Sequence, residues 1–229
     1  MRRIVVLAST VAALVILFAP VDASTTTAAQ DRIWFAPDPG TIDYLDLFEH
    51  PEEWPHARQL VNVFKFYQQH TQTPAPDIVG PNTYDALVRV NAFHLLNQWG
   101  IKTAIEVGAV KDFYCTPDAS GINAAIANTI ASVNAVQAAG GTVSYLAMDE
   151  PFVSGRDAIC GGPALEPTAD RVATYVAGVN AASPSIQIGL IEAYPFSSAP
   201  AVETIVQLLK SRSVTLAFLH MDVDWHLSG

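Results

Sequence analysis

Two adjacent carboxylates and a proline, Asp149-Glu150-Pro151, directly follow the apolar run Val143 to Met148. A glutamate beside a second acidic side chain, with Phe152 nearby, is expected to have a raised pKa, because like charge and desolvation both disfavour its ionised form. A carboxyl group that keeps its proton near neutral pH can act as a general acid. The alternative is a helix start, since carboxylates also favour helix N-termini.

Polar or aromatic residues also follow the other apolar runs of the chain. They are Asp38, Gln68, His70, Glu106, Glu192, Tyr194, His220, Asp222, Asp224, Trp225 and His226. In a parallel α/β protein the carboxyl ends of the strands meet at one face, where ligands bind. We therefore expect these side chains to converge with Asp149 and Glu150 on one site.

Six short apolar runs alternate with stretches of helical spacing from residue 31 onward. The runs are Ile33 to Ala36, Val61 to Tyr67, Thr103 to Val107, Val143 to Met148, Ile186 to Ile191 and Val214 to Met221. This alternation predicts right-handed βαβ units and a parallel sheet. No G-x-G-x-x-G or G-x-x-x-x-G-K-[ST] motif follows a run, which argues against a nucleotide-binding doubly wound fold.

Six such units fit an α/β fold of the (β/α)8 TIM-barrel type, truncated after the sixth βα unit. The last run is followed by the short segment up to Gly229, where a further helix would begin. Two more units would bring the domain to about 270 residues, close to the usual barrel size of about 250. A complete six-stranded open sheet is the alternative.

The first 23 residues have the pattern of a secretory signal peptide. Arg2 and Arg3 precede the apolar stretch Ile4 to Ala19, which is short for a membrane span, and Val21-Asp22-Ala23 offers a cleavage site. We expect a polar lead-in over residues 24–30 and an incomplete barrel domain over 31–229. The mature protein would then be secreted or periplasmic, with no membrane attachment after cleavage; a retained N-terminal anchor is the alternative.

The net charge indicates which partners are disfavoured, and the cysteine content bears on the covalent structure. The net charge of −10 disfavours binding to nucleic acid and to anionic membranes. Cys115 and Cys160 are the two cysteines of the chain, and in an exported protein such a pair is expected to form a disulfide. Two buried free thiols are the alternative.

Asp149-Glu150-Pro151 at the end of the fourth run resembles the Asn-Glu-Pro of retaining (β/α)8-barrel glycoside hydrolases. In that family the glutamate is the general acid/base and the asparagine binds the sugar 2-hydroxyl. The resemblance implies the acid/base role for Glu150 and a substrate-binding role for Asp149. Aspartate at the asparagine position keeps a hydrogen-bond acceptor, loses the amide donor and adds a charge.

The resemblance places the nucleophile on a seventh strand, which lies beyond the six runs. Among the residues present, Glu192 is our candidate for the second catalytic carboxylate, and Asp222 and Asp224 are substitutes. Retaining enzymes hold their two carboxyl groups about 5–5.5 Å apart and inverting enzymes about 6.5–9.5 Å apart. The sequence leaves both outcomes open.

Aromatic and acidic residues at the strand ends favour a carbohydrate ligand. We expect Trp34, Asp38, Tyr194, Asp222, Asp224 and Trp225 to bind substrate, the aromatic rings by stacking on sugar faces, although core packing would also explain the rings. His220, Asp222, Asp224 and His226 lie at every second position and suggest a metal site, but along one strand they extend about 20 Å, too far for one ion. We expect no metal and no cofactor.

Three functions follow from these residues. We expect a secreted glycoside hydrolase that acts on an extracellular polysaccharide or glycoconjugate by carboxylate acid/base catalysis. A non-catalytic carbohydrate-binding barrel is the second reading, because the nucleophile strand lies beyond the six runs. A metal-dependent hydrolase built on the sixth strand is the third.

Overall fold

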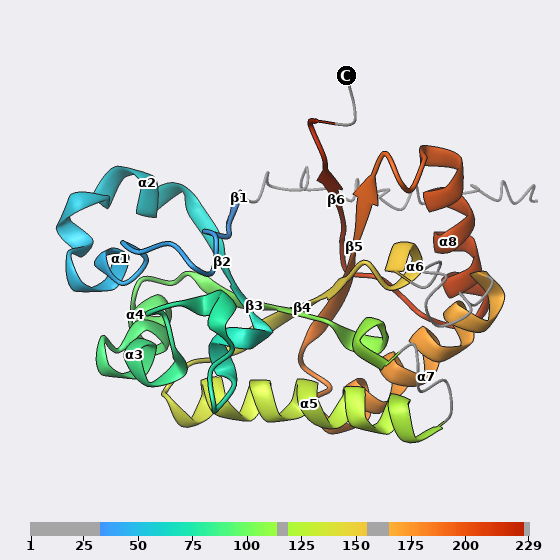
Figure 1. Ribbon diagram of the computed structural model, residues 1–229, viewed down its shortest axis with the longest axis horizontal. Helices are drawn as coiled ribbons and strands as arrows, with labels where there is room; N and C mark the ends of the chain where they lie inside the picture. The colour runs from blue at the N-terminus through green and yellow to red at the C-terminus, as the bar shows by residue number, and fades with distance from the viewer. Residues whose placement is uncertain (1–32, 114–118, 155–164, 227–229) are drawn as a thin grey trace, which may run out of the picture. The chain divides into compact units, whose positions relative to one another are not determined.

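Six parallel strands form a single sheet in the order β1-β2-β3-β4-β5-β6, seen in the computed structural model of Figure 1. The strands are β1 (Ile33–Phe35), β2 (Val61–Tyr67), β3 (Lys102–Val107), β4 (Val143–Asp149), β5 (Gln187–Tyr194) and β6 (Leu219–Val223). The structure describes residues 33–113, 119–154 and 165–226, which all belong to one compact unit, Arg32–Gly229. Each strand pairs in parallel with the next strand along the chain.

Helices connect the strands and cover the outer face of the curled sheet (Figure 1). The α-helices are α1 (Asp46–Glu49), α2 (Pro55–Leu60), α3 (Tyr84–Arg89), α4 (Ala92–Gln98), α5 (Ala119–Ala138), α6 (Pro151–Ser154), α7 (Leu165–Ala182) and α8 (Ala199–Ser211). Short 3-10 segments are η1 (Pro51–Glu53), η2 (Gln68–Thr71), η3 (Asp77–Val79) and η4 (Ala109–Phe113). Consecutive βα units in this order, with every strand parallel, are the arrangement of six units of a (β/α)8 barrel.

Alternation along the strands separates two apolar layers. Side chains such as Phe64, Ile105 and Leu190 pack against the helices in one large core. The intervening positions face the inner side of the sheet, where Val63, Ala104 and Tyr145 form a second, small cluster with Trp34 and Phe218. Because successive strand residues point to opposite faces, the same two-residue period continues into the strand ends. That period decides which polar residues reach the inner face.

The parallel sheet expected from the sequence is confirmed, and one strand lies later in the chain than predicted. Val214 to Met221 was the expected sixth run, whereas β6 is Leu219–Val223. The difference arises because Val214 follows the turn that ends α8, where its N–H donates to the carbonyl of Leu209 in the last turn of the helix at 3.0 Å. The Val214 side chain is apolar because it is buried beneath the helix, and not because the residue pairs in the sheet.

Several expectations fall outside the described residues. The signal peptide over 1–23, the lead-in over 24–30 and both cysteines, Cys115 and Cys160, lie there, so the export signal and the disulfide stay predictions. Within the described residues, no helix combines the length and the apolar character that crossing a membrane requires.

Gly189 is expected to be intolerant of any side chain. A Cβ at this inner-facing position of β5 would overlap the ring of Phe218, which is itself held at 4.7 Å from Trp34 and 5.9 Å from Tyr145 between ring centroids. We expect Gly189→Ala to destabilise the protein by about 1–3 kcal/mol, because the surrounding rings leave little room to repack. Urea denaturation measures this change.

Gly178→Ala is the matched control for that prediction. Its added Cβ meets the terminal carbon of Ile126, a flexible aliphatic side chain that is half-buried, and alanine also has the higher helix propensity. A Gly189→Ala protein that unfolds at the same urea concentration as the wild type, or later than Gly178→Ala, would contradict the packing argument.

Candidate active site

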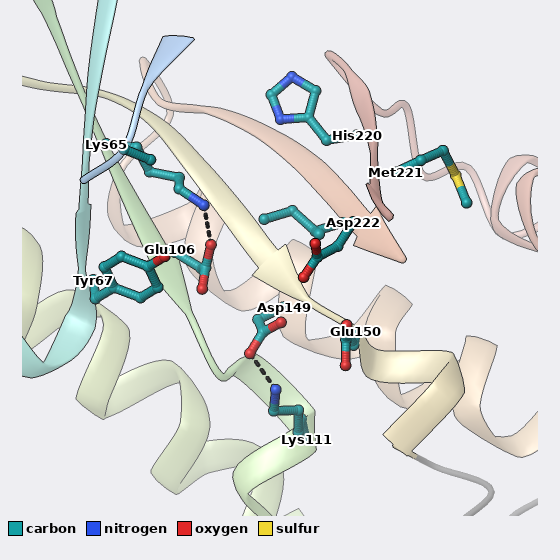
Figure 2. Close-up of a pocket in the computed structure, with 11 residues that line it drawn as sticks. Lys65, Tyr67, Glu106, Lys111, Asp149, Glu150, His220, Met221 and Asp222 are labelled. Atoms are coloured by element: carbon teal, nitrogen blue, oxygen red, sulfur yellow. Dashed lines mark hydrogen bonds and ion pairs between the residues drawn. The ribbon is translucent and has the colours of Figure 1, made fainter. Parts of the chain in front are cut away.

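A cavity of about 500 Å³ lies on the inner face of the sheet, at the carboxyl ends of the strands (Figure 2). It is lined by Ala36, Lys65, Tyr67, Glu106, Lys111, Asp149, Glu150, Ile191, His220, Met221 and Asp222. Most of these side chains come from strands β2 to β6, and Lys111 comes from η4. Polar residues from different strands therefore converge on one site, as expected for this type of sheet.

The strand period explains how the chain brings these residues together. On β2, Lys65 and Tyr67 are two residues apart and face the cavity, whereas Phe66 between them is fully buried in the helix-facing core. On β6, His220 and Asp222 share the same spacing. The cavity thus continues the inner face above the small aromatic cluster, with polar side chains replacing apolar ones toward the strand ends.

Two lysine–carboxylate ion pairs lie within the cavity. Lys65 pairs with Glu106, and Lys111 pairs with Asp149, as the dashed lines in Figure 2 show. The side chains of the first pair are 14% and 13% exposed, so both charges are largely removed from water. Pairing offsets the cost of burying each charge. Glu150 and Asp222 are the lining carboxylates without a lysine partner among the described residues.

Glu150 combines partial burial with an unusual backbone conformation. Its φ of 47° lies in the left-handed region, which is uncommon for residues other than glycine, and its N–H donates to the carbonyl of Ile191 at 3.0 Å. Burial raises the pKa of Glu150, the charge of Asp149 raises it further, and Lys111 opposes both. Asp222 is also close enough for its charge to raise this pKa. Glu150 therefore holds its proton more readily than a free glutamate.

The pKa values of Tyr67 and His220 in the cavity are also shifted, in both cases mainly by burial. Burial raises the pKa of Tyr67 to about 12, and the charges of Glu106, Asp38, Asp222 and Asp149 contribute in that order. Tyr67 consequently stays protonated and can donate a hydrogen bond. Burial, followed by the charge of Lys65, lowers the pKa of His220, so its imidazole is neutral at neutral pH.

Aromatic rings on the inner face of the sheet pack against His220, which lines the cavity. Trp34 packs against Tyr145, Phe218 and His220, with ring centroids 5.1, 4.7 and 4.7 Å apart. The sequence predicted a substrate-binding role for Trp34, but Trp34 is not among the residues that line the cavity. Its ring faces the inner cluster because β1 contributes this position to the barrel interior.

The structure corrects the expected position of Glu192. Its side chain is 0% exposed and faces the helices, since it lies two residues after Leu190 on β5. The carboxylate accepts hydrogen bonds from the N–H groups of Phe152 at 2.9 Å and Val153 at 3.2 Å and from the Ser197 hydroxyl at 3.3 Å. Burial raises the pKa of Glu192 to about 7, against the effect of these bonds. Glu192 does not line the cavity and cannot touch a ligand there.

The remaining predicted substrate-binding residues lie around the site without lining it. Asp38 is exposed, and its Oδ1 accepts a hydrogen bond from the N–H of Gly40 at 3.0 Å. Asp224 accepts from the N–H of His226 at 2.9 Å, which forms a local turn after β6. Tyr194 and Trp225 are 40% and 81% exposed, at and beyond the ends of β5 and β6. Of the predicted site residues, Asp149, Glu150 and Asp222 meet in the cavity.

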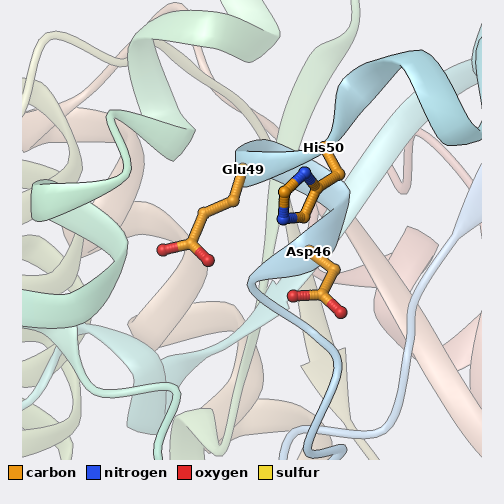
Figure 3. Close-up of side chains that lie close together, drawn as sticks. All are labelled: Asp46, Glu49 and His50. Carbon is orange, nitrogen blue, oxygen red and sulfur yellow. The ribbon is translucent and has the colours of Figure 1, made fainter.

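Three side chains of metal-ligating type lie close together on and next to α1, and none of them lines the cavity. Among the described residues, Asp46, Glu49 and His50 bring one ligand atom each to within 4.8 Å of one another, and Figure 3 shows them on α1 and the residue that follows it. All three side chains are exposed, and exposed acidic groups often cluster in this way without a metal. Among the described residues, His220, Asp222, Asp224 and His226 form no such group.

Lys65 and Lys111 line the cavity, although no role was predicted for either residue from the sequence. Lys65 interrupts the apolar run Val61 to Tyr67, and a charge inside a strand with buried neighbours signals an inner-facing functional position. Lys111 lies in η4, after the end of β3, and its contact with Asp149 depends on how η4 packs against the end of β4. No spacing in the sequence indicates that contact.

No family model and no curated protein matches the chain. Among solved structures, the chain is similar to a glucosidase from Croceicoccus marinus, with 14% identity and a TM-score of 0.46 over 83% of this chain and 43% of that one. It is also similar to a β-glucosidase from Exiguobacterium marinum, with 10% identity and a TM-score of 0.46 over 78% and 55%. A third is a β-glucosidase from Thermotoga maritima, with 15% identity and a TM-score of 0.42 over 72% and 42%. The chain matches between 42% and 55% of the length of these three structures.

Opposite changes at Lys111 and Asp149 are expected to move the pKa of Glu150 in opposite directions. Lys111→Met removes a positive charge and should raise this pKa, whereas Asp149→Asn removes a negative charge and should lower it. Carbon-13 NMR of the Glu150 carboxyl group during a pH titration measures both shifts. Lys210→Met, an exposed lysine on α8, is the control and should leave the titration unchanged. Shifts of the same sign in the first two variants would contradict the charge argument.

Glu192 is expected to make the protein less stable as the pH rises. The folded pKa of about 7 lies above the ordinary value of 4.5, so the native state holds a proton that the unfolded chain has already released. This contribution is fully present below about pH 4.5 and is lost as the pH rises through about 7, on the order of 1–3 kcal/mol. Glu192→Gln cannot titrate, and its free energy of unfolding should fall less between pH 5 and pH 8.

Urea denaturation of both proteins at the two pH values tests this difference. Glu106 and Glu150 also have raised pKa values, and burial lowers the pKa of His70 to about 4, but these groups are present in both proteins. The comparison therefore isolates Glu192. An equal fall in both proteins would show that Glu192 does not gain a proton on folding.

Proposed function

We propose that the chain cleaves glycosidic bonds, with Glu150 as the general acid/base and Asp222 as the second, ionised carboxylate. The proposal is carried by a difference in surroundings among the four carboxylates that line the cavity. Glu106 and Asp149 pair with lysines. Glu150, whose pKa burial raises, and the exposed Asp222 have no lysine partner among the described residues. Glycoside hydrolysis requires such a division, with one carboxyl group protonated and a second ionised.

Five polar residues of the cavity, Glu150, Asp222, Tyr67, Lys111 and Asp149, have a role in this proposal. Glu150 protonates the leaving-group oxygen while the glycosidic bond breaks. If Asp222 attacks the sugar directly, a covalent intermediate forms and Glu150 later removes a proton from the water that hydrolyses it. If Asp222 instead removes the proton from the attacking water, the sugar is hydrolysed in one step and Glu150 acts only as the acid. Tyr67 and the Lys111–Asp149 pair bind sugar hydroxyls. The Asp149-Glu150-Pro151 resemblance to the Asn-Glu-Pro of barrel glycoside hydrolases supports the same assignment.

Exposed aromatic side chains at the ends of β5 and β6 favour carbohydrate binding as the second candidate function. Tyr194, Phe196 and Trp225 are 40%, 57% and 81% exposed, and flat rings of this kind can stack on sugar faces. A binding barrel would need these rings and the polar cavity but no proton transfer. We propose that either activity acts outside the cytoplasm, on the basis of the signal peptide expected over residues 1–23.

Glu150→Gln is expected to reduce hydrolysis of aryl glycosides with poor leaving groups by about 10²- to 10⁴-fold, because positioned acid catalysis contributes that much. Glycosides with good leaving groups need less proton donation and should lose much less. Asp222→Asn should slow both classes of substrate. The measurement is kcat/KM of the purified protein on paired aryl glycosides.

Glu166→Gln is the matched control, because Glu166 is an exposed glutamate that pairs with Arg212 outside the cavity. It should retain wild-type rates. Glu150→Gln with wild-type rates on poor leaving groups would remove the acid/base assignment. A wild-type protein that binds oligosaccharides without cleaving them would favour the binding barrel.

A further inference from the structure

Three hydrogen bonds attach the turn after β4 to the end of β5. The N–H of Glu150 donates to the carbonyl of Ile191 at 3.0 Å. The next two turn residues with an N–H, Phe152 and Val153, donate to the two carboxylate oxygens of Glu192 at 2.9 and 3.2 Å. Residues 150 to 153 are thus held by two consecutive residues of the neighbouring strand.

A carboxylate at position 192 is costly unless it makes these bonds. Ile188 and Leu190 precede it on the same face of β5, and both belong to the apolar core beneath the helices. An aliphatic side chain would suit that layer, because a buried carboxyl group must be fully hydrogen-bonded to offset its desolvation. Glu192 meets that requirement with two backbone N–H groups and the hydroxyl of Ser197. Its partners lie in the segment that follows Glu150.

The backbone at Glu150 needs such an attachment. A φ of 47° is uncommon for a residue with a Cβ and persists when the surrounding structure imposes it. Pro151 follows Glu150 and has no N–H to contribute, so the hydrogen bonds on either side of it fix the turn. The direction in which the Glu150 side chain leaves the strand depends on this conformation.

We propose that Glu192 is a positioning residue that holds the Glu150 carboxyl group in the cavity by anchoring the backbone of residues 150–153. The proposal rests on the catalytic role proposed for Glu150. Glu192 itself touches no ligand, because it is buried on the opposite face of the sheet. Glu192 was the sequence-based candidate for the second catalytic carboxylate. In this proposal it acts by positioning Glu150.

Loss of the carboxylate is expected to release the turn. Glu192→Ala leaves the N–H groups of Phe152 and Val153 without acceptors in a buried region, and amide hydrogen exchange at both positions should accelerate about tenfold or more relative to the rest of the sheet. On poor-leaving-group aryl glycosides, kcat should fall about 10- to 100-fold while KM changes less than about threefold, because a displacement of about 1 Å at a catalytic group has that effect. Glu192→Gln should lie between, since its amide oxygen can still accept one N–H bond.

Thr129→Val is the control for general destabilisation. It removes a buried hydrogen bond of 2.7 Å between Thr129 and the Tyr175 hydroxyl, at the packing of α5 against α7 and away from the turn. Unchanged exchange at Phe152 and Val153 in Glu192→Ala would overturn the proposal. A loss of kcat in Glu192→Ala no greater than in Thr129→Val would also overturn it.

The titration of Glu150 separates this proposal from the proposed function. Glu192→Gln and Glu192→Ala both lack the charge, so a carbon-13 titration of Glu150 that differs between them reports a change of position. Identical titrations would overturn the positioning role. If the wild-type protein cleaves no glycoside, the proposed function fails, and the exchange and titration experiments still decide whether Glu192 positions Glu150.

Discussion

Alternation along six parallel strands decides on which face of the sheet each charged side chain of the strands lies. One set of positions packs under the helices in the main core, and the other set faces the inner side of the sheet. Lys65 and Glu106 fall on the inner set and reach the cavity, whereas Glu192 falls on the outer set and is buried. A shift of one residue in strand register would exchange these environments. The site therefore depends on the register of the sheet as a whole.

Charge pairing makes the polar inner face possible and also sets its chemistry. Four carboxylates and two lysines line one cavity, so the two ion pairs leave an excess of negative charge. That excess contributes to the raised pKa values of Glu150 and Tyr67, because each carboxylate disfavours ionisation of its neighbours. Removing either lysine would change two things together, the stability of the inner face and the protonation of the groups around it.

Local signals in the sequence predicted the sheet but could predict only part of the site. Apolar runs and helical stripes identify strands and helices from neighbouring residues alone, and the parallel order follows from their alternation. The sequence shows less clearly where a strand ends, and therefore which face its last residues occupy. The fifth run was expected to stop at Ile191, whereas β5 continues to Tyr194. Only that extension shows that Glu192 shares a face of the sheet with Leu190. The contact of Lys111 with Asp149 joins η4 to the end of β4, and no residue spacing encodes it.

The Lys111–Asp149 pair bears on the aspartate that stands where the resembled hydrolases have asparagine. An amide side chain offers a sugar hydroxyl both an acceptor and a donor, whereas an ionised aspartate offers only acceptors. The ammonium group of Lys111 lies against the Asp149 carboxylate, supplies N–H donors and balances the added charge. Under the proposed function, this ion pair would place ammonium donors and carboxylate acceptors beside Glu150, where the resembled hydrolases have one amide side chain.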